Sequence, residues 1–265
     1  MQPAIQTVDL TRRFGDLIAV DRVSMAVSAG ETLGLIGSNG AGKSTLIKML
    51  TTLLPPSAGQ AWVAGADIVR EAAEVRRHIG YVPQLLSADG ALTGYENMLL
   101  SARLYALPRR ERASRIAEAL AAVDLTDAAG RLVQHYSGGM IRRLEIAQSM
   151  LHRPAVLFMD EPTVGLDPVA RRTVWDQVRA LRAAYGTTML VTTHHMDEAE
   201  ALCDRVAILH RGQLTAIGTP AELKASLGPG ATLDAVFAHF TGTELEPAEG
   251  YRDVRRARRS VHEHG

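Results

Sequence analysis

Residues 37–45 carry the feature that most constrains this chain, because they match the phosphate-binding pattern G-x-x-x-x-G-K-[ST] at every fixed position. The apolar residues 32–36 before this loop predict a buried strand, and residues 46–50 after it have helix-forming composition. Such a loop directs backbone N–H groups and the positive end of a helix dipole at an anion. We therefore predict a nucleoside triphosphate site, in which Lys43 reaches the β- and γ-phosphates and Ser44 ligates Mg²⁺. The predicted phosphate-binding residues are Gly37, Ser38, Asn39, Gly40, Ala41, Gly42, Lys43, Ser44 and Thr45.

Length and composition limit the remaining possibilities. The 265 residues fit one α/β domain with an inserted lobe. Lys plus Arg and Asp plus Glu both number 29, so the basic excess of a dedicated nucleic-acid binder is missing. Cys203 is the only cysteine, which rules out an intrachain disulfide. No apolar run approaches the roughly 18 residues of a membrane-spanning helix, so we expect any membrane role to come through a partner.

The apolar pattern predicts a mixed α/β fold. Residues 4–30 alternate apolar and polar positions, as antiparallel strands do, and residues 93–130 show helical periodicity interrupted at Pro108. We interpret the second stretch as an inserted helical lobe. Further strands are expected at 61–64, 76–83, 155–159, 187–193, 206–209 and 212–216, and further helices after Gly139, at 169–184, from Pro220 and at 236–240.

Polar residues follow several of these predicted strands. Gln84, Asp160, Glu161 and His194 each stand where an apolar run ends. Because ligands of α/β sheets bind beyond the carboxyl ends of the strands, these residues are candidates for contact with a nucleotide. The two carboxylates suit Mg²⁺ and a water to be polarised, and the histidine suits a sensor of the γ-phosphate. The alternatives are a solvated Asp-Glu turn, a structural histidine and an exposed glutamine without a specific role.

Two weaker signals lie elsewhere. Phe14 precedes the turn signal at residues 15–16, where an exposed ring could stack on adenine or simply pack. Residues 137–139 form a Ser-Gly-Gly turn before a helical stretch, which suits either a second anion site or an ordinary N-cap. The arginines of the C-terminal tail suggest a solvated segment or, less simply, contact with anionic lipid headgroups; they are Arg252, Arg255, Arg256, Arg258 and Arg259.

In their order and spacing these motifs resemble ATP-binding cassette (ABC) ATPase subunits over residues 4–240. The resemblance implies a P-loop NTPase cassette with a RecA-like mixed-sheet core, an antiparallel β subdomain and an inserted helical subdomain. We expect the nucleotide-binding core with its β subdomain at 1–84 and 155–225. The helical subdomain with the signature motif is expected at 85–154, and a C-terminal extension at 226–265.

By the same resemblance each motif has an implied role. Phe14 would stack on adenine, Gln84 would meet Mg²⁺ and the attacking water, and Asp160 would hold the metal. Glu161 would act as general base, and His194 would contact the γ-phosphate. The motif residues that would contact the ATP of a second copy, or organise the interface with it, are Ser137, Gly138, Gly139 and Asp167. ATP and Mg²⁺ are thus the implied cofactors, and a head-to-tail dimer is the implied assembly.

Three departures from the family pattern stand out. Tyr136 replaces the usual Leu and Met140 the usual Gln of the signature, and Phe14 replaces the commoner Tyr. His195 directly follows His194, to which we assign the switch position.

The amino-acid sequences of residues 137–147, 161–168 and 192–200 resemble those of the daunorubicin-resistance type of exporter ATPase. That type implies a separate polytopic permease, which the chain would energise from the cytoplasmic face of the membrane as a peripheral subunit. An importer ATPase shares all these motifs and stays an alternative. A soluble ABC protein that acts on ribosomes or DNA is a second alternative. Proteins of that class usually carry two cassettes or a long coiled-coil insertion, and this sequence shows neither.

Overall fold

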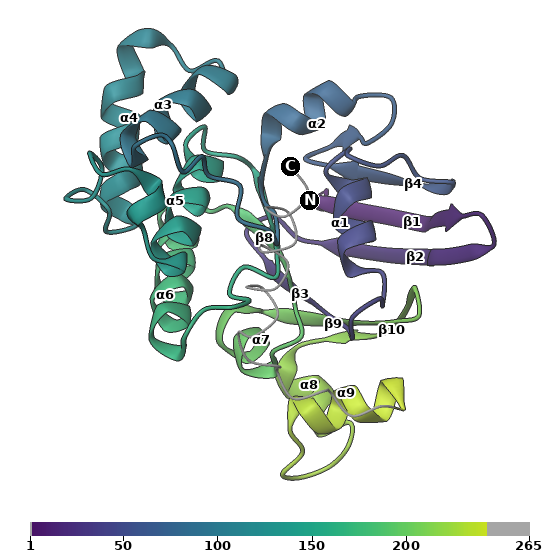
Figure 1. Cartoon of the computed structure of the whole chain (residues 1–265). Coiled ribbons are helices and arrows are strands. Elements are labelled where there is room, and N and C mark those ends of the chain that lie inside the picture. Colours follow the sequence, from purple (N-terminus) through teal and green to yellow (C-terminus); the bar gives the residue numbers. More distant parts are fainter. Residues whose placement is uncertain (1, 243–265) are drawn as a thin grey trace, which may run out of the picture.

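The computed structural model describes residues 2–242, so the arginine-rich tail lies outside the described residues. A six-stranded sheet runs through the molecule in the order β10-β9-β3-β8-β7-β6 (Figure 1). Its strands are β3 (Thr32–Ile36), β6 (Ile79–Val82), β7 (Val156–Asp160), β8 (Thr188–Thr193), β9 (Arg205–His210) and β10 (Gln213–Gly218). All pairs are parallel except the β9–β10 hairpin. The carboxyl ends of β3, β6, β7 and β8 therefore meet at one edge of the sheet.

The central strands are apolar because both of their faces are covered. Every residue of β3, β7 and β8 is buried. Along β7 successive side chains alternate between two clusters: Phe158 packs with α1 (Lys43–Leu50), and Leu157 packs with α6 (Pro168–Tyr185). A continuous apolar run is what a strand buried on both faces requires.

The first part of the chain forms a second, antiparallel sheet with the order β2-β1-β4-β5. Its strands are β1 (Ile5–Phe14), β2 (Leu17–Val27), β4 (Ala58–Val63) and β5 (Ala66–Asp67). Register shifts between β1 and β2 mark bulges that bend this long hairpin. One apolar cluster joins this sheet and α1 to the parallel sheet, so the phosphate loop is anchored on both sides.

The helical lobe lies on the opposite side of the molecule from the antiparallel sheet (Figure 1). It consists of α3 (Gly94–Leu104), α4 (Arg109–Ala122), the short helix Val133–His135 and α5 (Gly138–Met150). A separate cluster fills it, to which α3 contributes Met98, α4 contributes Ile116 and α5 contributes Leu144. The domain boundaries expected from the sequence stay a prediction.

Three more helices follow β8 and β10. They are α7 (Met196–Leu202), α8 (Pro220–Ala225) and α9 (Leu233–Thr241), which pack together against β9 and the end of β3. Within residues 2–242, no helix has the length and apolar character needed to cross a membrane.

Two local expectations differ from the structure. Residues 76–78 end a helix, α2 (Ala72–His78), and the strand begins only at Ile79. Arg76, Arg77 and His78 fill its last turn, where positive charge is favoured by the helix dipole. The strand expected at 61–64 spans Ala58–Val63 instead, because Ala58 and residues 60–63 pair with β1.

Candidate functional site

The phosphate loop between β3 and α1 takes a shape that only glycine allows at two positions. A Cβ on Gly37 would lie 2.6 Å from the Leu209 carbonyl oxygen. Gly42 has φ +105°, and a Cβ there would lie 2.3 Å from the carbonyl oxygen of Ala19. The neighbouring backbone thus holds the loop closely from β2 and β9, and α1 begins directly after it. This arrangement fits a bound phosphate chain, since the glycine-shaped loop leads directly into the N-terminus of α1.

Lys43, the first residue of α1, is buried and reaches two kinds of partner. Its Nζ donates to the carbonyl oxygens of Gly37 at 2.7 Å and Ser38 at 3.2 Å. The same Nζ lies 3.2 Å from Glu161 Oε1. The cation is therefore positioned between the loop and the end of β7, where phosphate oxygens could exchange with its present acceptors.

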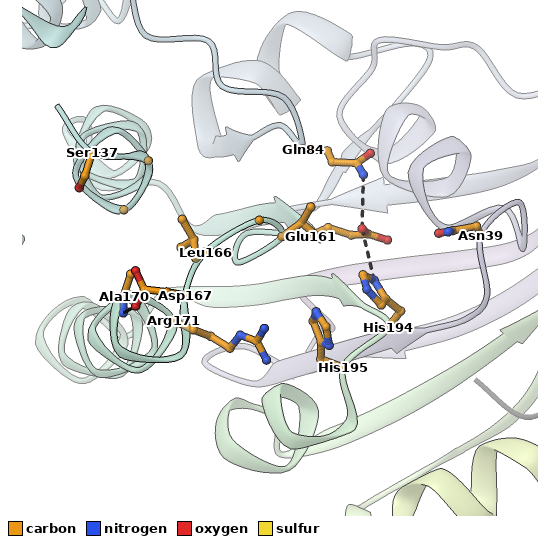
Figure 2. Close-up of a pocket in the computed structure, with 14 residues that line it drawn as sticks. Asn39, Gln84, Ser137, Glu161, Leu166, Asp167, Ala170, Arg171, His194 and His195 are labelled. Atoms are coloured by element: carbon orange, nitrogen blue, oxygen red, sulfur yellow. Dashed lines mark hydrogen bonds and ion pairs between the residues drawn. The ribbon is translucent and has the colours of Figure 1, made fainter. Parts of the chain in front are cut away.

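Glu161 lies just beyond β7 and gathers three polar side chains. Besides Lys43 at Oε1, Gln84 Nε2 donates to Oε2 at 3.3 Å, and His194 Nδ1 lies 3.4 Å from the same oxygen (Figure 2). Glu161 has φ 48°, a left-handed conformation unusual for a side chain with a Cβ. Backbone strain of this kind concentrates at functional sites, and here it turns the carboxylate out of the strand direction.

The charge state of Glu161 follows from its surroundings. Burial raises the pKa of its carboxyl, but the contact with His194 and the positive charge of Lys43 outweigh burial, so the net pKa lies below the usual value. The carboxylate is therefore ionised at neutral pH and able to accept a proton.

Asp160, the last residue of β7, faces a different set of partners. Its Oδ1 accepts from Thr192 Oγ1 at 2.6 Å and from Ser44 Oγ at 3.2 Å. Among the residues that the structure describes, no group of three or more His, Cys, Asp or Glu side chains could hold a metal alone. One carboxylate beside one hydroxyl nevertheless fits Mg²⁺, which keeps several waters and binds through one or two carboxylates plus phosphates of the substrate. Gln84, the third predicted metal ligand, directs its Nε2 at Glu161 instead.

An open cavity of about 770 Å³ joins Glu161 to the start of α5. Figure 2 shows Asn39 and His194 at one side of this cavity and Ser137 at the other. Eight of the residues singled out from the sequence line it; they are Asn39, Gln84, Ser137, Gly138, Gly139, Glu161, Asp167 and His194. The other phosphate-loop residues and Phe14 are not among its lining residues.

Ser137 and Asp167 each cap a helix at this cavity. The Ser137 Oγ accepts from the Met140 N–H at 3.2 Å and so begins α5. Asp167 Oδ1 accepts from the N–H groups of Val169 and Ala170, both at 2.9 Å, and so begins α6. Two helix N-termini therefore open on the cavity, and an anion there would meet the positive ends of both dipoles.

Phe14 ends β1 at the tip of the hairpin and is 45 % exposed. The guanidinium carbon of Arg12 lies 4.6 Å from the centre of its ring, and Arg12 Nη1 donates to the Pro55 carbonyl oxygen at 2.8 Å. The arginine covers one side of the ring, and the exposed part is open to a flat partner such as a base.

Several residues at the site were not singled out from the sequence. Thr192 bonds Asp160 and also accepts from the Glu161 N–H at 2.9 Å. Arg171 lines the cavity together with His195. Glu198 on α7 is buried and accepts from Thr163 Oγ1 at 2.8 Å and Trp175 Nε1 at 3.0 Å. Of these residues, only Thr192 left a signal in the sequence, as a polar residue within an apolar strand. Its contact with Asp160 could be recognised only once β8 was known to lie beside β7.

Comparison with known proteins adds independent observations. A family model described as ABC transporter matches residues 20–164. The daunorubicin/doxorubicin resistance ATP-binding protein of Streptomyces peucetius is 48 % identical over 225 residues, covering 85 % of this chain and 68 % of that protein. A daunorubicin resistance ATP-binding protein of Streptomyces coeruleorubidus is 46 % identical over 231 residues, with 87 % and 72 % covered. A solved ATP-binding subunit of an ABC transporter superposes with TM-score 0.80 at 31 % identity, covering 89 % of this chain and 99 % of that one.

Proposed function

This chain belongs to the ABC transporter family and is an ATP-binding, ATP-hydrolysing subunit, and from that premise we propose that it energises a separate membrane permease for the export of drug-like or lipid-like molecules. The chemistry uses ATP with Mg²⁺, and two cassettes close head-to-tail around it. The observation that carries the proposal is the convergence of Lys43, Gln84 and His194 on the carboxylate of Glu161.

Each of these residues has a proposed part in hydrolysis. Lys43 neutralises phosphate oxygens at the loop, and Glu161 takes the proton of the attacking water. Gln84 and His194 orient the groups around Glu161. Asp160 and Ser44 would hold Mg²⁺, which would neutralise charge on the phosphates. Phe14 stacks on the base at the tip of the hairpin.

In this proposal each ATP site is built from two copies of the chain, and the residues around the Ser-Gly-Gly turn serve the ATP of the other copy. One chain carries one phosphate loop and one Ser-Gly-Gly turn. Ser137, Gly138 and Gly139 contact the γ-phosphate held by the other copy, and Asp167 organises the interface between the copies. Binding of ATP then favours the closed dimer and hydrolysis releases it, because the γ-phosphate contacts differ between the two states.

Export and its direction rest on the relatives. The two curated relatives described above are named for resistance to daunorubicin. We propose that the chain sits at the cytoplasmic face of the membrane through its permease. The division into a core at 1–84 and 155–225, a helical subdomain at 85–154 and an extension at 226–265 belongs to the same proposal.

The role of Glu161 is tested by Glu161→Gln, which keeps the shape of the side chain and removes its basicity. We expect turnover to fall by about 10²–10⁴, the usual span for a general base, while titration calorimetry shows ATP affinity retained. Glu200→Gln is the matched control, because Glu200 pairs with Lys224 on the surface and lies outside the cavity. Turnover at the level of the unmodified protein in Glu161→Gln would refute the assignment.

The transport part of the proposal has its own experiment. A tagged copy of the full chain is recovered from membranes, and co-purifying polytopic proteins are identified by mass spectrometry. A permease without an associated binding protein supports the exporter. A permease accompanied by a binding protein supports the importer, and ribosomes or DNA-repair proteins in its place would overturn the transport role.

A further inference from the structure

A buried ion pair on α5 holds the segment that carries Gln84. Arg142 and Glu145 lie one helical turn apart, 3.0 Å from each other, and each side chain is only 2 % exposed. Burying two charges is costly unless other polar groups satisfy them. The other hydrogen bonds of Arg142 and Glu145 therefore show which part of the chain the pair holds in place.

Those further partners lie outside α5, in residues 83–88. Arg142 Nη1 donates to the Pro83 carbonyl oxygen at 2.6 Å, and Nη2 donates to the Gln84 carbonyl oxygen at 2.7 Å. Glu145 Oε1 accepts from the Ser87 N–H, from Ser87 Oγ at 3.1 Å and from the Ala88 N–H at 3.3 Å. Arg142 thus donates to carbonyl oxygens at the start of the segment, and Glu145 accepts from N–H groups at its end.

Besides these bonds, Ala88 at the end of the segment packs against the apolar cluster of the helical lobe. Residues 83–88 belong to no helix or strand, and Leu85 is 82 % exposed. A cavity of about 160 Å³ lies beside the segment, lined in part by Pro83, Ser87 and Glu145. Close packing is thus missing on that side, and the polar bonds to the ion pair set the course of the backbone.

Gln84 and α5, which this ion pair connects, both take part in the proposed chemistry. The Gln84 side chain donates to Glu161, and α5 begins at Ser137 with the Ser-Gly-Gly turn. Because a helix moves as a rigid element, a shift of that turn would also displace Arg142, which bonds the backbone of Gln84, and Glu145, which bonds Ser87 and Ala88.

We propose that the buried Arg142–Glu145 pair is a positioning device, which fixes the Gln84 carboxamide on Glu161 and couples its place to the Ser137–Gly139 turn. This inference rests on the proposed function, because it needs Gln84 to act in hydrolysis. Neither residue of the pair lines the cavity, so both act through Gln84 and not on the nucleotide.

The test is a double-mutant cycle in the full chain. Arg142→Lys keeps the charge but cannot donate to two carbonyls and a carboxylate in the fixed fork of a guanidinium. We expect kcat to fall roughly 10- to 100-fold, as for a misplaced catalytic group, with an unchanged ATP dissociation constant. Added to Gln84→Ala, the same substitution should cause no further loss, because the group that it misplaces is already gone.

A second measurement reports the segment itself. Hydrogen–deuterium exchange at the amides of Ser87 and Ala88 should speed up in Arg142→Lys. Arg143→Lys is the matched control, since Arg143 donates to the carbonyls of Val123 and Asp124 on the other side of α5. Its effect on kcat should multiply with that of Gln84→Ala, and exchange at Ser87 and Ala88 should not change. If Arg142→Lys does not fold, Glu145→Gln, which removes the charge and keeps an acceptor oxygen, replaces it in both measurements.

The outcomes separate the two proposals. If Gln84→Ala lowers kcat but Arg142→Lys multiplies that loss, or leaves amide exchange unchanged, the positioning role is wrong and the proposed function stands. Turnover at the unmodified level in Gln84→Ala alone would overturn the proposed role of Gln84 and with it any positioning role for the pair.

Discussion

At the scale of single residues, Asp160 and Glu161 are neighbours in the chain with different surroundings. Asp160 accepts hydroxyl hydrogen bonds from Thr192 and Ser44, whereas Glu161 faces Lys43, Gln84 and His194. The left-handed φ of Glu161 separates the two carboxylates, so one suits a metal and the other a proton.

Thr192 serves both carboxylates, and its removal should disturb metal use. In Thr192→Val, Asp160 loses its 2.6 Å hydrogen bond and the Glu161 N–H loses a side-chain acceptor. We expect a loss of about 1–3 kcal/mol in the free energy of unfolding and a higher Mg²⁺ concentration for half-maximal ATPase activity. Thr187→Val, which removes a hydroxyl bonded to the Pro154 carbonyl at the other end of the strand, is the control. An unchanged Mg²⁺ requirement in Thr192→Val would contradict this role.

His195 should make stability depend on pH. Burial lowers its pKa to about 4, helped by the charges of His194 and Arg171 and opposed by Asp197 and Glu161. Between that value and the ordinary pKa of about 6.5, the unfolded chain binds more protons than the folded one, so stability rises with pH. Because the ring is partly exposed, we expect only about 1 kcal/mol between pH 5 and pH 7.5.

Urea unfolding of the full chain at the two pH values measures this difference. His195→Asn should reduce the pH dependence, whereas His239→Asn on α9 should retain it. Equal pH dependence in His195→Asn and the unmodified chain would show that another group is responsible.

At the scale of elements, Tyr136 shows how the unusual start of the signature motif is accommodated. Its ring is buried in the cluster of the helical lobe, and its hydroxyl donates to the Ala128 carbonyl oxygen at 2.7 Å. A Cβ on Gly94 would lie 2.3 Å from that hydroxyl, so α3 begins with a glycine where the tyrosine needs room. Tyr136 therefore ties the segment before α5 to the turn that follows α4, beside the start of α3, and the Ser-Gly-Gly turn still begins its helix normally.

Tyr136→Phe isolates the hydroxyl contribution. We expect a loss of about 1 kcal/mol in the free energy of unfolding, the usual net value of a hydrogen bond, measured by urea denaturation. Tyr95→Phe on α3 is the control, because Tyr95 is 40 % exposed. Equal stability of Tyr136→Phe and the unmodified chain would mean that water replaces the hydroxyl at Ala128.

At the scale of the whole molecule, the proposed dimer requires contact between the Ser-Gly-Gly turn of one copy and the nucleotide of the other. A Cβ on Gly138 would meet only Leu166 Cδ2 at 3.7 Å, so a larger side chain fits the fold and projects into the cavity. Gly138 is thus a position where assembly can be blocked without disturbing the folded chain.

We expect Glu161→Gln with ATP and Mg²⁺ to form a dimer visible by light scattering. Adding Gly138→Asp should abolish that dimer, because a carboxylate there repels the γ-phosphate of the other copy, while calorimetry still detects ATP binding. Gly130→Asp is the control, since a Cβ there has no atom within 4 Å and Gly130 does not line the cavity. A dimer that survives Gly138→Asp would argue against contact in trans.

The phosphate loop, the mixed α/β fold and most elements could be predicted because they depend on short-range signals. Glycines at fixed spacing, apolar runs such as residues 156–160 and the turn at Pro108 act through neighbours in the chain. Helix α2 was missed because its apolar face contributes only Val75 to the core, so the periodic signal is weak. The resemblance to ABC ATPases rested on motif order, which the family comparison confirms.

Sequence alone thus determined the family, the ATP chemistry and the residue types available for it. Tertiary structure decided how they meet: Lys43, Gln84 and His194 come from three separate parts of the chain and converge on Glu161 because β3, β6, β7 and β8 end at one edge. The order of strands decided that Thr192 lies beside Asp160, and α5 decided that a buried ion pair holds the Gln84 backbone. Such contacts depend on packing between segments distant in the chain, for which local patterns carry no signal.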